Sequence, residues 1–150
     1  MKALLEHLYF IAQYLSEADL ETVIGVFLID LGFPAGRPSF EYIKTAVVLY
    51  AGNPEQLLFY ELYPEVARKC GRKTKMQVEI AMRREIHRLW QKRDEGKWNL
   101  YFPSGITTRE KGPSNAELLS GMLQVLEVWE GCCENYRKKA REQSEETAKL

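Results

Sequence analysis

The chain has 150 residues, enough for one compact domain, and its 45% hydrophobic residues can fill a single core. Its formal net charge is zero, so the overall composition favours no nucleic-acid partner. The three cysteines have neither metal-ligand spacing nor the even number of a disulfide framework, and the N-terminus has neither a signal-peptide cleavage site nor an uninterrupted apolar span. We therefore expect a cytoplasmic protein with reduced thiols, no metal, no cofactor and no membrane partner.

Two amphipathic helices are predicted at the start of the chain. Apolar residues recur at helical spacing from residue 4 to residue 15 and indicate a first helix. Ser16, with Asp19 three residues later, predicts the cap of a second helix that stops at Gly32. We assign residues 1–18 to an extra N-terminal amphipathic helix.

The next segment is predicted to contain two further helices. Ser39 is expected to cap the first of them, which ends near Asn53. A short helix is then expected over residues 54–60.

The sequence of the central segment predicts a helix-turn-helix over about residues 64–92. Pro64 suits the first turn of a helix, and Gly71 suits the position just after its end. Thr74 and Gln77 have the spacing of a capping box, so a second helix is expected to start there and to continue to about Lys92.

The C-terminal part is predicted to hold a short element around residues 98–102, a loop and one long helix. Ser114 and Glu117 form another capping-box pattern at the start of that helix. Its apolar face ends after Tyr136, which leaves residues 137–150 as a charged tail. Because no stretch alternates like a strand, the expected fold is all-α, a compact bundle of about six to seven helices.

Charge is distributed unevenly along the chain. Residues 65–93 carry ten basic and three acidic side chains, a net of +7, whereas residues 1–64 carry three basic and eight acidic ones, a net of −5. Residues 94–150 carry eight basic and ten acidic side chains, a net of −2. A short basic block in an otherwise acidic protein is typical of a surface that binds a polyanion. A solvated helix face without a ligand is the alternative.

The second helix of the motif is expected to bury one side and to present the other to the major groove of DNA. At about 100° per residue, its outward side holds side chains that can reach base edges. The expected base-facing residues are Gln77, Ile80, Arg83, Arg84 and His87. The expected phosphate contacts, around the turn and on the flank of the helix, are Lys69, Arg72, Lys73, Lys75 and Arg88.

A set of residues spread in order over about a hundred positions carries a resemblance to a known family. They are Leu31-Gly32-Phe33-Pro34-Ala35, Tyr42, Ala46, Leu62-Tyr63-Pro64, Ala67, Val78-Glu79, Ala81, Arg83, Ile86, Trp90, Phe102, Pro113-Ser114-Asn115 and Glu117. With this pattern, the stretch from about Glu21 to Trp129 resembles the C-terminal effector domain of the sporulation response regulator, stage zero sporulation protein A. The resemblance implies a six-helix bundle over residues 19–136, promoter binding by the second motif helix, and tandem dimers on the DNA.

The chain also departs from that family. Only about 20 residues precede the match, too few for a receiver domain. Control by phosphorylation of a fused receiver is therefore not expected. Glu79 and Arg83 match the family, but Gln77 and Ile80 stand at two base-reading positions where the family has arginine, and Arg84 stands where histidine is expected. We do not expect recognition of the family's own promoter box.

Two functions follow from these patterns. The first is a transcription regulator, or an accessory to one, that binds double-stranded DNA through the helix-turn-helix and that forms a candidate homodimer. The alternative is a protein-interaction module that kept the helical bundle, and Ile80 on the outward face favours this reading. Enzymatic activity is not expected, because His7 and His87 lie in separate helices and no catalytic motif or small-molecule substrate site is recognisable.

Overall fold

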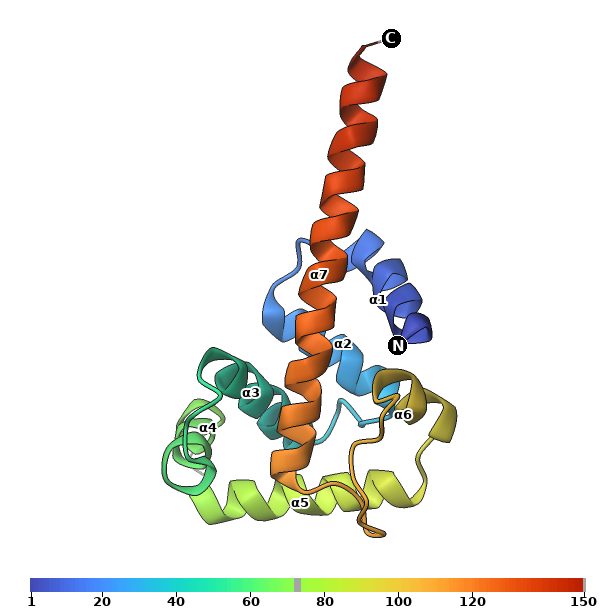
Figure 1. The fold of residues 1–150 in the computed structure, drawn as a ribbon. Coiled ribbons are helices and arrows are strands. Elements are labelled where there is room, and N and C mark those ends of the chain that lie inside the picture. Colours follow the sequence, from blue (N-terminus) through green and yellow to red (C-terminus); the bar gives the residue numbers. More distant parts are fainter. Residues whose placement is uncertain (72–73, 150) are drawn as a thin grey trace.

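A computed structural model describes residues 1–71 and 74–149 of the chain, and within them all the regular structure is helical (Figure 1). The expected all-α class is therefore confirmed. The elements are α1 (Lys2–Leu15), α2 (Leu20–Leu31), α3 (Pro38–Gly52), the short π-helical turn η1 (Leu58–Leu62), α4 (Tyr63–Lys69), α5 (Lys75–Gln91), α6 (Glu95–Tyr101) and α7 (Asn115–Ala148). No helix within the described ranges combines the length and the apolar character needed to span a membrane.

Helix α7 is the axis of the molecule (Figure 1). It contacts α1 along its middle, α3 nearer its start, and α5 at its N-terminal end. Its last turns project beyond the other helices, whereas α5 lies across the opposite end. One long side of α5 therefore forms an end surface of the bundle.

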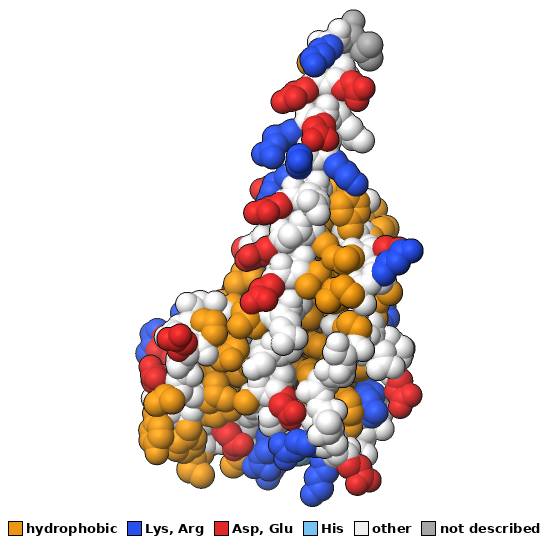
Figure 2. Space-filling model, in the orientation of Figure 1, with side chains coloured by type: hydrophobic (Ala, Val, Ile, Leu, Met, Phe, Trp, Pro, Cys, Tyr) orange, Lys and Arg blue, Asp and Glu red, His pale blue; other side chains and the backbone are white. Residues whose placement is uncertain are grey.

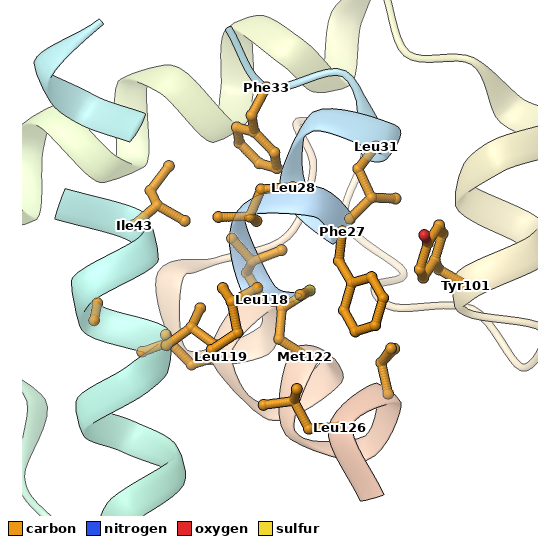
Figure 3. Packing of buried hydrophobic residues seen from close by; sticks show 14 of the residues in the cluster. Phe27, Leu28, Leu31, Phe33, Ile43, Tyr101, Leu118, Leu119, Met122 and Leu126 are labelled. Atoms are coloured by element: carbon orange, nitrogen blue, oxygen red, sulfur yellow. The ribbon is translucent and has the colours of Figure 1, made fainter. Parts of the chain in front are cut away.

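The core forms where α2 meets the first half of α7 (Figure 3). Buried side chains from α3 and α6, and also from α1, α4 and α5, extend it. The residues that follow, from α2, α3, α6 and α7, are all buried. They are Phe27, Leu28, Leu31, Ile43, Tyr101, Leu118, Leu119, Met122 and Leu126. The apolar face of α7 that the sequence indicates before Tyr136 is thus buried.

Two predicted helix starts are wrong. Asp19, not Ser16, caps α2, because Asp19 has the extended backbone of an N-cap and its carboxylate accepts a hydrogen bond from the Thr22 amide at 2.8 Å. Ser16 has helical backbone angles and ends α1 instead. Helix α3 begins one residue before Ser39, at Pro38, whose fixed φ suits the first helical position.

The helix expected over residues 54–60 is also wrong. Its first residues form a turn, and η1 begins only at Leu58 and continues directly into α4. The Glu61 carboxylate accepts a hydrogen bond from the Leu57 amide at 3.0 Å, which places the start of this element later than the sequence suggested.

The charged tail is a continuation of α7. Residues 137–148 contain no glycine or proline and are rich in residues with high helix propensity. Arg137 joins this part to the end of α1, because its guanidinium donates a hydrogen bond to the Ser16 carbonyl at 3.1 Å and lies 3.8 Å from the Glu17 carboxylate. Beyond Arg137 the described residues are exposed.

A polar cluster joins α1, α2 and α6. The Asp30 carboxylate accepts hydrogen bonds from the Tyr101 hydroxyl at 2.6 Å and from the Lys97 ammonium at 2.8 Å, and His7 Nε2 lies 2.9 Å from the same carboxylate. Burial alone would raise the pKa of Asp30, but the hydrogen bonds from Lys97, Tyr101 and His7 outweigh it and hold this pKa below its usual value. The ionised form of Asp30 therefore stabilises the fold.

Asp30→Asn is expected to lower the free energy of unfolding at pH 7 by on the order of 2 kcal/mol, because charge-assisted hydrogen bonds are lost. The lowered pKa means that the carboxylate stabilises the fold above the unfolded-state pKa of about 4, and that this stabilisation is lost as the pH falls through the folded-state pKa. Urea melts of both proteins between pH 7 and pH 3 measure the difference. The difference in unfolding free energy between the two proteins should shrink as the pH falls. A difference that is independent of pH would show that the Asp30 charge does not stabilise the fold. Glu142→Gln, at an exposed position, is the control.

Candidate nucleic-acid interface

Helices α4 and α5 are consecutive and pack against each other. Ala67 of α4 is buried, and Gly71 has a φ of +113°, which is a left-handed conformation that suits glycine just after a helix. Arg72 and Lys73, two expected phosphate contacts in the turn, lie outside the described residues.

The capping box predicted at the start of α5 is confirmed. The Thr74 hydroxyl accepts a hydrogen bond from the backbone N–H of Gln77 at 3.2 Å, and the side-chain Oε1 of Gln77 accepts one from the backbone N–H of Thr74 at 2.9 Å. A glutamine reads adenine with both its carbonyl oxygen and its NH₂ group. Because Oε1 is held at the cap, the NH₂ group of Gln77 is the part of the side chain that is free of the cap.

Helix α5 buries one side, whereas its outward side is only partly exposed. Its inward side holds Val78, Met82, Ile86 and Leu89, all buried. Among the expected base-facing residues, Gln77, Arg83 and Arg84 are exposed, whereas Ile80 and His87 are half-buried.

The arginines of α5 differ in their partners. Arg83 Nε lies 3.0 Å from the Glu79 carboxylate one turn earlier, so part of its charge is balanced within the helix. Arg84 takes part in no ion pair with the described residues. Arg84 is therefore the exposed cation of α5 with the most charge available for a polyanion.

The lysines expected around the turn also differ. Lys69, at the end of α4, is exposed. The Lys75 ammonium lies over two aromatic rings, 4.3 Å from the centroid of Phe59 and 5.0 Å from that of Tyr60. A cation–π contact keeps the charge but limits the positions that the ammonium can reach.

The sequence does not predict that an acidic side chain of α5 is buried. The Glu85 side chain is 2% exposed, and its Oε2 accepts hydrogen bonds from Arg88 at 2.6 Å and from Arg37 at 3.3 Å. Its Oε1 is buried and has no hydrogen-bond partner among the described residues. Arg37 immediately precedes α3, so this contact joins the α2–α3 connection to α5.

The loop between α6 and α7 lies beside the C-terminal half of α5 (Figure 1). Trp90 Nε1 donates a hydrogen bond to the Glu110 carbonyl at 3.1 Å, and a Cβ atom added at Gly112 would lie 2.7 Å from Trp90 Cγ. The exposed Arg109 and Lys111 of this loop thus lie near α5, which the sequence analysis did not anticipate.

Asn115 fixes the helices that carry this surface. It is buried at the start of α7. Its side-chain Nδ2 donates hydrogen bonds to the Tyr63 hydroxyl of α4 at 3.1 Å and to the Glu79 backbone carbonyl of α5 at 3.2 Å. Burial raises the pKa of Tyr63, so its hydroxyl stays protonated at neutral pH. Asn115 therefore links α4 and α5 to the start of α7.

The end surface of the bundle has two parts (Figure 2). Lys and Arg side chains gather beneath the start of α7, where α5 lies, and hydrophobic side chains gather to one side of them. Four exposed residues from η1, its preceding turn and the start of α5 make up what we term the apolar patch: Leu57, Phe59, Tyr60 and Met76. Histidine, cysteine and carboxylate side chains of the described residues form no group of three or more that could hold a metal ion.

A helical bundle with two consecutive packed helices, the second basic on its outer side, has the architecture of a DNA-binding regulatory domain. Residues 24–126 match the family described as sporulation initiation factor Spo0A C terminal. This match covers more than half of the chain, so the chain belongs to that family, and the resemblance inferred from the sequence is confirmed. The family domain is the DNA-binding effector domain of a sporulation regulator. Helix α1 and the outer part of α7 lie outside the matched residues.

Proposed function

We propose that this chain regulates transcription by binding duplex DNA, with α4 and α5 as a helix-turn-helix whose second helix enters the major groove. The observation that carries the proposal is the exposed outer side of α5, where Arg84 has no ion-pair partner among the described residues, in a domain of a DNA-binding family. Base edges and phosphates are the ligands that such a surface recognises.

The proposed roles of the described residues follow from their exposure and their partners, and those of Arg72 and Lys73 follow from their place in the sequence. Arg84 is the principal base contact, Arg83 contacts a base after it leaves Glu79, and His87 contacts a base or a nearby phosphate. Gln77 and Ile80 complete the base-facing surface. The proposed phosphate contacts are Lys69, Arg72, Lys73, Lys75 and Arg88. We further propose that two copies bind the DNA together, as tandem dimers of the family would.

Arg84→Ala is expected to weaken binding to a preferred duplex roughly tenfold and to relax the preference at one base pair, because a bidentate base contact is lost. Fluorescence anisotropy with the preferred duplex and with single-position variants measures both effects. Arg141→Ala, which removes an exposed charge from the outer part of α7, is the matched control. An equal loss of affinity for every duplex would instead indicate that Arg84 contacts a phosphate.

The apolar patch favours a second function, the binding of a protein partner. It adjoins the start of α5, so a partner seated there would also reach Ile80. Wild-type protein that binds no duplex at low salt would support this candidate over the first, because counterion release makes even non-specific DNA binding strongest at low salt.

A further inference from the structure

Glu85 is a buried carboxylate in a helix that is otherwise basic on its outer side. Moving a carboxylate out of water costs several kcal/mol unless charged partners compensate it. Two arginines do so here, and both donate to the same oxygen, Oε2. Glu85 therefore brings together two guanidinium groups that would otherwise repel each other.

The two arginines remain open to solvent. The side chains of Arg37 and Arg88 are 47% and 49% exposed, whereas that of Glu85 is 2% exposed. Each guanidinium has five N–H donors, and Glu85 occupies one nitrogen of each. The Glu85 carboxylate neutralises one of the two guanidinium charges. The trio of Arg37, Glu85 and Arg88 therefore retains one positive charge.

The trio lies on the flank of the proposed DNA-binding surface. Arg88 follows Arg84 by four residues and is thus about 40° from it around α5, on the side toward Glu85. When a helix occupies the major groove, the residues on its flanks face the sugar-phosphate walls of the groove. Arg37 reaches this flank from the residue before α3, outside the helix-turn-helix.

We propose that Arg37 and Arg88, held together by Glu85, form a binding site for one backbone phosphate of duplex DNA. Two converging guanidinium groups match the tetrahedral oxygens of a phosphodiester, and each has N–H donors to spare for it. Glu85 is the positioning residue of the site. This inference rests on the proposed function, since it names the phosphate that the flank of α5 would contact.

Glu85→Gln separates positioning from simple electrostatics. The change removes a negative charge near DNA, so Coulomb attraction alone would strengthen binding. If Glu85 positions the two arginines, binding should weaken several-fold although the protein becomes more basic. Circular dichroism and urea melts of the variant establish that it is folded at the assay temperature.

Arg37→Ala tests the site with a substitution that lies outside α5, and circular dichroism and urea melts establish that this variant is also folded. It should weaken binding to preferred and unrelated duplexes alike, by roughly tenfold, and reduce the slope of log Kd against log salt by about one. Arg37→Lys keeps the positive charge but lacks the planar guanidinium group with its paired donors. It should therefore restore the salt slope but only part of the affinity. Arg137→Ala is the matched control, because Arg137 is 41% exposed and also lies beside a glutamate, but it belongs to the C-terminal half of α7 and lies beside the end of α1.

Two results would show that no phosphate binds here and that the two arginines are only structural partners of a buried acid. One is tighter DNA binding by Glu85→Gln, and the other is an unchanged affinity and salt slope for Arg37→Ala. Either result, obtained while Arg84→Ala still loses base preference, refutes this site alone. Wild-type protein that binds no duplex refutes the proposed function itself, and the phosphate site with it.

Discussion

Deletion of residues 1–15 should remove most of the stability of the chain, although α1 lies outside the part that matches the family. Leu4, Leu8 and Ala12 are buried on the face that α1 turns to the bundle. Removing a buried leucine side chain typically costs about 2 to 5 kcal/mol, so two leucines are worth on the order of 5 kcal/mol or more. That equals a large share of the roughly 5 to 15 kcal/mol that stabilises a domain.

The deletion also takes His7 away from Asp30 and exposes the side of α7 that α1 covers. Thermal and urea melts should therefore show a broad, low transition or none. Removal of residues 138–150 is the control, because the described residues among them are exposed, and it should cost less than about 1 kcal/mol. Similar melts for the two truncations would show that α1 is not part of the core.

Ile80→Arg should change the base that the protein prefers. Ile80 lies on the outer side of α5 between Gln77 and Arg84 at helical spacing, and it is half-buried. A branched apolar side chain in the major groove can contact only the thymine methyl group, whereas arginine donates two hydrogen bonds to guanine. We expect wild type to favour thymine at this position and Ile80→Arg to favour guanine, with a change in discrimination of about 1 to 3 kcal/mol.

Selection from random duplexes, run on both proteins, measures this preference, and Met76→Arg is a control that adds the same charge at the edge of the surface. Overall affinity should rise for both variants because of the charge. Guanine should be gained at one position only for Ile80→Arg. Identical preferred sites for wild type and Ile80→Arg would mean that Ile80 does not face a base.

Much of the fold could be predicted from local patterns. The capping boxes at Thr74 and Ser114 depend on residues three apart, and the inward side of α5 depends on helical periodicity, so both could be read from the sequence. The sequence predicts the starts of α2 and α3 wrongly, because Ser16 and Ser39 are good caps in isolation. The choice between neighbouring caps depends on the backbone angles that the packed bundle imposes.

The candidate surface could be predicted only in part, because its electrostatics depend on contacts between distant residues. Arg37 and Glu85 are 48 residues apart, and Asp30 is 67 residues from Lys97. No periodicity or motif links such pairs. The sequence therefore placed Glu85 in a basic helix without showing that it is buried, and it gave no reason to connect Arg37 with DNA.

Amide chemical-shift mapping measures most directly whether the outer side of α5 is the DNA-binding surface. In ¹H–¹⁵N spectra of the protein titrated with its selected duplex, we expect the largest changes at Gln77, Ile80, Arg83, Arg84 and His87. Smaller changes should appear at Lys69 and Arg88 on the flanks, and the outer part of α7 should stay unchanged. Changes centred on the apolar patch or on α1, with α5 unaffected beyond its first turn, would show that DNA does not bind to the outer side of α5.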